Sequence, residues 1–212
     1  MGHDTFGKRG LREIATNVAG LMATATAVAF YSKYESIQLT YQVSTSPVTQ
    51  NAGDAEIKGV ELEAQARLGS HFSLNANGGY IDAGYTKILA GAVNTTGSVL
   101  PKTPKWKISV SPDLHTILDN GRTLRFGVDY SHVGNMYNDV QNTEMISRRE
   151  SDVLSASAGL ASADEKMVLT VGGTNLTDER YLTTGQPQLA GGVIYGTYNA
   201  RRQWYATLEV KF

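Results

Sequence analysis

Hydrophobic and polar residues alternate along most of this chain, most strictly at its C-terminus. From Gln203 to Phe212 every even position is apolar and every odd position is polar or amphipathic. A period of two is that of a β-strand with one apolar face. Together with a less regular stretch near residues 22–31, the alternation predicts about nine strands, which lie at 37–43, 60–68, 72–80, 106–114, 124–130, 154–160, 167–171 and 203–212. Because no segment has a convincing helical period, we predict an all-β fold, an antiparallel up-and-down meander.

The connections between these segments are of two kinds. Short ones rich in turn-forming residues are predicted near 32–36, 68–71, 117–121 and 162–165. Long ones rich in Gly, Asn, Thr and Gln are predicted near 45–55, 85–104, 134–149 and 177–201. Short and long connections alternate, as they do in a transmembrane barrel with short turns on one side and long loops on the other.

Composition excludes several classes of protein. The 212 residues carry a formal net charge of -1, so we predict no nucleic-acid partner. There is no cysteine, which excludes disulfides and Cys-based zinc sites. No run of eighteen apolar residues would form a membrane-spanning helix. A hydrophobic fraction of 41% nevertheless fits a membrane barrel, because half of each strand would face a polar lumen.

Chemistry-bearing motifs are absent from the sequence. The histidines, at positions 3, 71, 115 and 132, have no metal-ligand spacing and fall on different predicted elements. No nucleophile elbow occurs, and the Gly-Gly pairs at 172–173 and 191–192 are not followed by a helix that could hold phosphate. We therefore predict no catalytic residue, no metal ligand, no cofactor and no enzymatic activity.

The N-terminal segment, residues 1–21, receives no assignment, and residues 22–212 are predicted to form a single unit. Lys8, Arg9 and Arg12 precede an apolar stretch at 21–29, an order that is typical of a signal peptide. Glu13, Asn17 and several threonines make that interpretation poor. We favour a strand there.

Aromatic and charged residues fit a barrel wall. Tyr31, Trp106, Tyr181 and Trp204 lie near predicted strand ends, where interfacial girdles occur, although a soluble sheet also uses aromatic residues. The charges that alternate with apolar residues are expected to face inward, because lipid exposure of a basic group costs roughly 2–4 kcal/mol at the midplane. They are Glu61, Glu63, Arg67, Lys105, Lys107, Arg125, Asp129, Glu209 and Lys211.

Four local patterns, in this order, resemble the C-terminal part of a TonB-dependent outer-membrane receptor. They are FYSKYESIQL at 30–39, AEIKGVELE at 55–63, LPKTPKW at 100–106, and NLTDERY at 175–181 followed by Gly185 and a final strand ending in Phe212. The resemblance covers about residues 22–212. It implies part of a 22-stranded transmembrane β-barrel in the outer membrane of a Gram-negative bacterium. This chain would supply about strands fourteen to twenty-two without the plug domain, so we expect an open sheet, a fragment of a barrel.

The resemblance also implies a function and partners. The parent receptor would take up a scarce ligand such as a ferric siderophore, cobalamin, haem or a glycan. Its partners would be outer-membrane lipid, the plug and remaining strands of the parent, and the barrel-assembly machinery, which would read Phe212 as part of an assembly signal. The TonB complex would act only through the absent plug.

Ligand contacts, if this chain makes any, are expected from the long loops. Tyr137, Asn138 and Gln141 in one loop and Tyr195 and Tyr198 in another are the candidates, and packing within the loops is the alternative role for all five. Two other functions stay open at this point. One is a different outer-membrane pore, and the other is a soluble secreted β-sandwich that binds carbohydrate.

Overall fold

The computed structural model of the chain describes residues 10–18, 20–43, 46–88, 99–188 and 192–212. Nine strands form one antiparallel sheet in the order β1-β2-β3-β4-β5-β6-β7-β8-β11, which confirms the predicted meander. Their bounds are β1 Gly10–Val18, β2 Leu21–Val43, β3 Ser46–Leu68, β4 Phe72–Ile88, β5 Trp106–Ile117, β6 Thr123–Val133, β7 Ser151–Ala161, β8 Met167–Thr174 and β11 Gln203–Val210. A separate hairpin of β9 Leu182–Gln188 and β10 Val193–Tyr198 and one 3-10 turn, η1 Glu144–Ile146, complete the elements.

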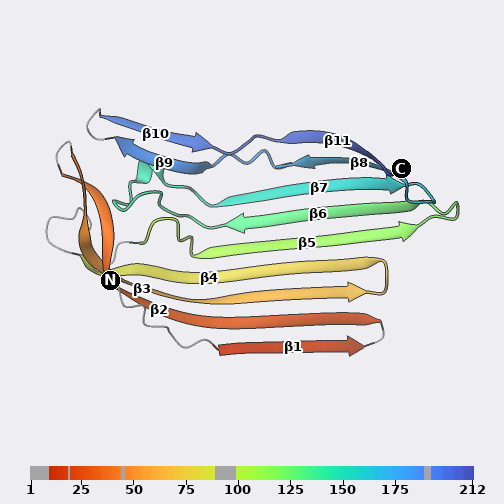
Figure 1. Cartoon of the computed structure of the whole chain (residues 1–212), viewed down its shortest axis with the longest axis horizontal. Coiled ribbons are helices and arrows are strands. Elements are labelled where there is room, and N and C mark those ends of the chain that lie inside the picture. The colour runs from red at the N-terminus through yellow and green to blue at the C-terminus, as the bar shows by residue number, and fades with distance from the viewer. Residues whose placement is uncertain (1–9, 19, 44–45, 89–98, 189–191) are drawn as a thin grey trace.

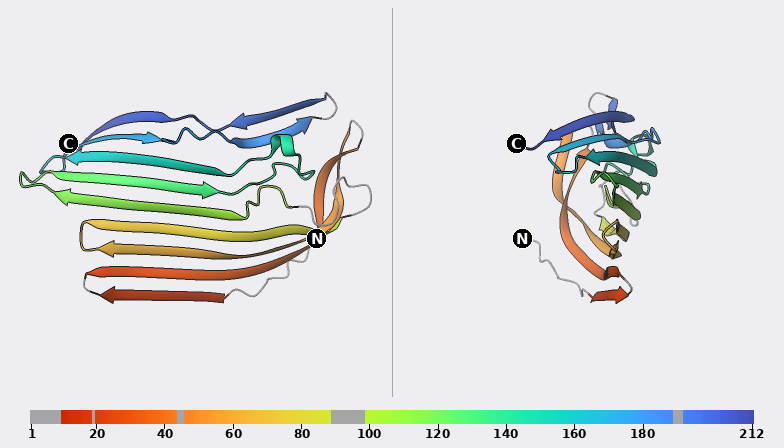
Figure 2. Two further views of the ribbon diagram at one scale, coloured as in Figure 1. Left: turned by 180° about the vertical axis from the view of Figure 1, so that it is seen from behind. Right: turned by 90° about the vertical axis from the view of Figure 1, so that its right-hand side faces the viewer.

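The sheet is curved and open. Figure 1 shows the nine strands side by side, and the end-on view in Figure 2 shows the arc that they form. Among the described residues, β1 and β11 each pair on one side only, so they are the two edges of the sheet. Short turns lie at one end, between β3 and β4 for example, and the long connections gather at the other end (Figure 1).

The predicted turn at residues 32–36 is wrong, because these residues lie inside β2. The ladder between β2 and β3 continues past them and shifts register around Tyr34 and Ile37. Ser36 has a positive φ of 55°, and its backbone N–H donates to Asp54 Oδ1 at 2.9 Å. The polar residues at this point therefore form a bulge in a strand, a feature whose local sequence resembles that of a turn.

The predicted long connection at 45–55 is also wrong. β2 and β3 extend to Val43 and Ser46, so the connection proper is residues 44–45, which lie outside the described residues. The far part of this hairpin bends across the end of the sheet (Figures 1 and 2). From residue 106 onwards, by contrast, every strand that the alternation predicts lies within three residues of its observed bounds.

The sheet also begins within the segment 1–21, where no element is predicted. β1 pairs with β2 from Gly10↔Ala29 to Val18↔Leu21, so the chain reverses direction between Val18 and Leu21 and not at the predicted turn at 32–36. The number of strands in the sheet agrees with the prediction because two differences cancel: β1 is added, and the segments 22–31 and 37–43 join into β2.

The buried apolar core lies at the long-loop end of the sheet. Leu39, Ala55 and Tyr85 are 6%, 1% and 3% exposed, and Leu100 and Val140 from two long connections pack against them. Strands that belong to one sheet without a second layer bury few side chains. The loop end is consequently the part of the molecule with fixed tertiary packing.

Candidate functional site

The two faces of the sheet differ in chemistry. The register aligns Glu63, Asn77, Ser109 and Ser131 across β3, β4, β5 and β6, which puts these polar side chains on one face, here called the inner face. The predicted inward charges share this face where they lie in strands: Glu61, Glu63, Arg67, Lys107, Arg125, Asp129 and Glu209. Lys105 and Lys211 lie just outside β5 and β11.

The opposite face, here called the outer face, is apolar and open. It carries the alternate residues of the same strands, including Leu62, Ile108, Phe126, Leu208 and Trp204. Leu62 and Leu208 are each 58% exposed and Trp204 is 73% exposed. An apolar face of this extent is costly in water and matches a lipid environment or a protein partner. The described residues contain no helix long and apolar enough to cross a membrane.

The long connections form one structure, here called the loop assembly, made of residues 99–105, 134–150 and the described part of 175–202. Asn142 joins the first two segments: it accepts from Val99 N at 3.0 Å and donates to Val99 O at 2.9 Å. Lys102 N donates to Tyr137 O at 2.8 Å. A single asparagine at a positive φ of 54° thus mimics a strand partner for the neighbouring loop.

Within the loop assembly, the segment 134–150 meets the described part of 175–202 at Ile146 and Arg148. Ile146 is 2% exposed and lies over Gly185 of β9, where a Cβ would approach Ile146 Cβ to 2.5 Å. The Arg148 guanidinium lies 3.8 Å from the centre of the Tyr181 ring and donates to Ser151 Oγ at 2.7 Å. Burial lowers the pKa of Arg148 from its usual value. A cation over an aromatic face in a half-buried place is a stabilising contact, so this arginine holds the hairpin base against the 134–150 loop.

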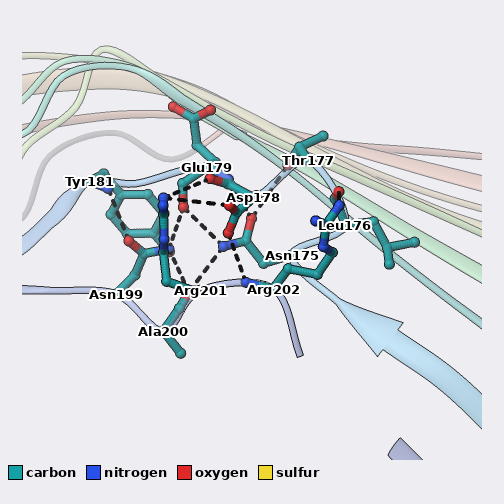
Figure 3. Close-up of polar contacts among 10 residues, drawn as sticks. All are labelled: Asn175, Leu176, Thr177, Asp178, Glu179, Tyr181, Asn199, Ala200, Arg201 and Arg202. Carbon is teal, nitrogen blue, oxygen red and sulfur yellow. Dashed lines mark hydrogen bonds and ion pairs between the residues drawn. The ribbon is translucent and has the colours of Figure 1, made fainter. Parts of the chain in front are cut away.

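Asn175 closes the third segment at its base (Figure 3). It is 6% exposed and follows β8 directly, at a positive φ of 51°. Its Nδ2 donates to Glu179 O at 2.9 Å and to Ala200 O at 3.0 Å, while its Oδ1 accepts from Glu179 N at 2.9 Å. Asn199 adds donor bonds to the same two carbonyls and accepts from Tyr181 N. These two amides therefore fix the chain that leaves β8 against the chain that enters β11.

Ionic contacts surround this amide pair. Asp178 Oδ1 accepts from the Arg202 N–H at 3.0 Å, and Asp178 Oδ2 lies 3.6 Å from Arg201 Nη1 (Figure 3). The hydrogen bond from the Arg202 backbone, aided by the nearby arginine charges, lowers the pKa of Asp178. Asp178 also has a positive φ, 53°. The NLTDERY pattern at 175–181 is therefore a clamp for the last strand.

The five predicted ligand residues all lie in the loop assembly, in two parts of it that touch. Tyr137 donates to Glu144 Oε1 at 2.8 Å, which raises the pKa of Tyr137, and Asn138 Nδ2 donates to Ile146 O at 2.6 Å. Tyr195 donates to Gln186 Oε1 at 3.0 Å, and the Tyr198 ring lies 4.3 Å from the Arg180 guanidinium. Gln141 is half-buried. A ligand-binding role for these five residues stays a prediction.

The predicted aromatic girdle divides into two groups. Tyr31, Trp106 and Trp204 lie on the outer face, where Trp106 packs against Tyr80 with ring centres 4.7 Å apart. Tyr181 lies instead in the loop assembly under Arg148. Phe212 follows β11 and is fully exposed. The girdle role of the four aromatic residues and the assembly-signal role of Phe212 stay predictions.

The glycine pair at 172–173 has a packing role on the sheet. Its partners in β11 are Tyr205 and Trp204, one on each face. A Cβ on Gly172 would meet the Tyr205 hydroxyl at 2.5 Å, and a Cβ on Gly173 would meet the Trp204 ring at 2.9 Å. Both side chains occupy the space that a Cβ would take, so the glycine pair provides room for the aromatic residues of the last strand.

Two of the described histidines lie closer together than their sequence spacing indicates, and a third is paired with a carboxylate. His71 and His115 stack with ring centres 6.1 Å apart, and His132 Nδ1 lies 2.9 Å from Asp152 Oδ1. The described residues contain no group of three or more His, Cys, Asp or Glu side chains that could hold a metal ion. Arg148, Asn142 and Asn199, the main fixing residues of the loop assembly, have no sequence signal beyond their occurrence in polar loops.

Comparison with known proteins gives a family match over most of the chain. The family model described as TonB dependent receptor-like, beta-barrel matches residues 10–176, beginning at the first residue of β1. Comparison with curated proteins found no match.

Solved structures show the same fold. The ferric yersiniabactin uptake receptor FyuA from Yersinia pestis has a TM-score of 0.76 and 26% identity over 97% of this chain and 30% of that one. The siderophore receptor PiuA from Acinetobacter baumannii has a TM-score of 0.70 and 20% identity over 94% and 28%. BauA, the ferric preacinetobactin receptor of the same organism, has a TM-score of 0.64 and 19% identity over 95% and 29%. The chain therefore spans less than a third of these structures.

Proposed function

The chain belongs to the TonB-dependent receptor-like β-barrel family, and from this membership we propose that it forms part of the barrel wall of an uptake receptor in a Gram-negative outer membrane. One observation carries the proposal: the sheet has an apolar, exposed outer face and a charged inner face, with ordered long loops at one end only. Lipid on one side and a polar lumen on the other are the surroundings that these faces match.

A ferric siderophore is the proposed class of ligand. PiuA is described as a siderophore receptor, and FyuA and BauA as receptors for ferric yersiniabactin and ferric preacinetobactin. FyuA shares 26% identity with this chain. Cobalamin, haem and glycans are the other ligands implied by the resemblance. Because the chain spans about 30% of FyuA, uptake is proposed for the assembled receptor and not for this chain by itself.

The loop assembly is the proposed ligand-facing part of the chain. Tyr195 and Tyr198 on β10 are 51% and 48% exposed, so they remain accessible although each makes an internal contact. Tyr137, Asn138 and Gln141 are half-buried in the neighbouring loop, where Tyr137 and Asn138 bond to other residues of the same loop. We assign direct contact with ligand to the β10 pair and support of the loop to the other three.

Further partners follow from the family. Open edges at β1 and β11 would pair with additional strands, because unpaired backbone groups in lipid cost several kcal/mol each. A plug would cover the inner face and couple the receptor to TonB. Phe212, exposed beyond β11, would be read by the barrel-assembly machinery.

The soluble β-sandwich is the less favoured alternative. A sandwich requires a second sheet over the apolar face, and in the described part of the chain that face remains open. A passive pore would have the same two faces. The difference between a pore and a receptor lies in whether uptake is specific and needs energy.

Two measurements on cells that encode this chain test the proposal. Membrane fractionation with an antibody to residues 134–150 is expected to find the chain in the outer membrane. Disruption of the gene is expected to abolish uptake of ⁵⁵Fe from one ferric siderophore, while uptake from the others continues. Disruption of tonB should give the same loss.

Each result would be interpreted separately. A soluble chain would overturn the barrel assignment. Uptake that survives loss of tonB would favour the passive pore, and loss of haem or cobalamin uptake in place of iron uptake would change the ligand class.

A further inference from the structure

Two histidines meet at the end of the sheet where the short turns lie (Figure 1). His71 ends the turn between β3 and β4, and His115 lies near the end of β5. The ladder between β4 and β5 runs to Phe72↔Leu114, and the His115 N–H continues it by donating to His71 O at 2.8 Å. The two residues therefore stand opposite each other as a cross-strand pair, with ring centres 6.1 Å apart.

The separation of the two rings is that of imidazoles that share one metal ion. A zinc–nitrogen bond of about 2.0–2.1 Å on each ring places the ring centres roughly 5–6.5 Å apart, depending on the angle at the metal. The observed 6.1 Å lies within that range, so a small rotation of the side chains brings both rings onto one ion. The sequence gives no indication of this site, because the two histidines come from different elements.

Each ring has a nitrogen that is available to a metal. The Ser70 hydroxyl lies 3.3 Å from His71 Nδ1. When Nδ1–H donates to that hydroxyl, the lone pair that a metal needs is on Nε2, and a hydrogen bond of this kind orients most metal-binding histidines. His115 is half-buried, and neither of its ring nitrogens has a hydrogen-bond partner among the described residues. A metal bond would replace the hydrogen bonds to water that this imidazole loses.

The charges around the pair are balanced. Arg125 faces His115 across β5 and β6, but its Nη2 lies 3.9 Å from Glu165 Oε1, which compensates its charge. Arg67 on β3 and Asp113 on β5 share the next row of the inner face. Two basic and two acidic side chains therefore surround the histidines, and no net positive charge opposes a metal ion.

We infer that His71 and His115 together bind one divalent transition-metal ion of the kind that prefers imidazole, Cu²⁺, Ni²⁺ or Zn²⁺. The described residues offer no third His, Cys, Asp or Glu to the same ion, so water completes its coordination. Such an ion ties the turn before β4 to the end of β5, at the opposite end of the sheet from the buried core. The inference goes beyond the proposed function and requires only that the sheet is folded.

Metal titration of the folded full chain in detergent tests the site. His3 is replaced by asparagine in every sample, so that His71, His115 and His132 are the remaining histidines. Isothermal titration calorimetry in a buffer that does not bind metals is expected to find one Cu²⁺ per chain, held about tenfold or more tightly than Zn²⁺. Electron paramagnetic resonance of the copper-loaded chain should show two imidazole nitrogens on the ion.

Single substitutions assign the two nitrogens. His71→Asn and His115→Asn should each lower the Cu²⁺ affinity about tenfold or more and leave one imidazole on the ion. His132→Asn is the matched control and should change neither result, because His132 is paired with Asp152 on the outer face. His71 lies in an exposed turn, where asparagine is well tolerated, so this variant keeps the test informative if His115→Asn disturbs β5.

Three results would overturn the inference. A Cu²⁺ affinity that is unchanged in both His71→Asn and His115→Asn would place the ion elsewhere on the chain. A loss in only one of these variants would show that the two histidines do not share an ion. Absence of binding to the parent chain would leave the pair as a ring contact only. None of the three affects the outer-membrane assignment, which membrane fractionation tests by itself.

Discussion

Replacement of Asn175 by alanine should release the clamp that fixes β11. The substitution removes the only described acceptor of the Glu179 N–H in a place that is 6% exposed, and an orphaned buried donor costs about 1–3 kcal/mol. The carbonyls of Glu179 and Ala200 each lose one donor but keep Asn199 Nδ2, which limits those two losses to about 0.5–1 kcal/mol each. The hydrogen bonds together therefore contribute about 2–5 kcal/mol.

Backbone conformation adds a second contribution that can be separated from the first. Asn175 has a φ of 51°, a left-handed conformation that costs alanine about 1–2 kcal/mol and glycine almost nothing. We therefore expect Asn175→Ala to lower the free energy of unfolding by about 3–7 kcal/mol, and Asn175→Gly by about 1–2 kcal/mol less. Asn199→Ala is the matched comparison: it removes the acceptor of the Tyr181 N–H and one donor from each of the same two carbonyls, but Asn199 has no positive φ. It should therefore cost only the hydrogen-bond contribution, about 2–5 kcal/mol, without the strain.

Urea titration of the folded full chain, followed by Trp204 fluorescence in a Trp106→Phe background, measures these differences. Trp204 is suited to this because it lies two residues after Arg202 of the clamp. A loss for Asn175→Gly equal to that for Asn175→Ala would refute the strain argument. Losses below about 1 kcal/mol for both Asn175 variants would refute the role of Asn175 as the clamp.

Three further predictions concern packing, acid stability and the loop assembly. Gly59→Ala places a Cβ against the Tyr80 carbonyl and should lower the free energy of unfolding by about 1–3 kcal/mol in the same titration, whereas Gly78→Ala, with open space around it, should be neutral. The lowered pKa of Asp178 means that its stabilisation is present above the ordinary carboxyl pKa and is lost as pH falls through the folded-state value, so Asp178→Asn should flatten the acid side of the stability profile. Arg148→Ala should speed amide hydrogen exchange in β9 and η1 while leaving β5 and β6 unchanged, because it removes the contact between two loops.

Each of these predictions has an outcome that contradicts it. Equal stability of the two alanine variants would mean that the backbone at Gly59 can move away. An acid profile of Asp178→Asn identical to that of the unmodified chain would place the pH sensitivity at another carboxylate. Faster exchange throughout the sheet in Arg148→Ala would show that the arginine acts on the whole fold and not on one junction.

Strict alternation predicted the sheet well wherever a strand has one apolar and one polar face. β11, β8 and β7 follow it closely, because side chains in a strand point alternately to the two faces and the two environments differ. The turn predicted at 32–36 fails for a local reason. Lys, Glu and Ser residues break the alternation there, and a bulge with a positive φ at Ser36 uses the same residue types as a turn.

Other features depend on contacts between distant segments. β1 has a mixed sequence, and its pairing with β2 makes it a strand. The hairpin β9–β10 lies in a stretch without alternation, and its base is held by Asn175, Asn199 and Arg148 from other parts of the chain. Propensity is weak in such segments, so tertiary contacts decide the outcome.

The sequence by itself determined the meander, the two faces of its wall and the family resemblance, because these depend on a period of two and on local patterns. Tertiary structure decided which polar residues meet: Asn175 with Ala200, Arg148 with Tyr181, and Asn142 with Val99. It also decided that the Trp204 ring lies against Gly173 on the outer face of the sheet. The physical reason is that the period of two in a strand follows directly from the different surroundings of its outer and inner faces. Contacts between residues 25 to 43 positions apart depend instead on the conformation of the long connections between strands.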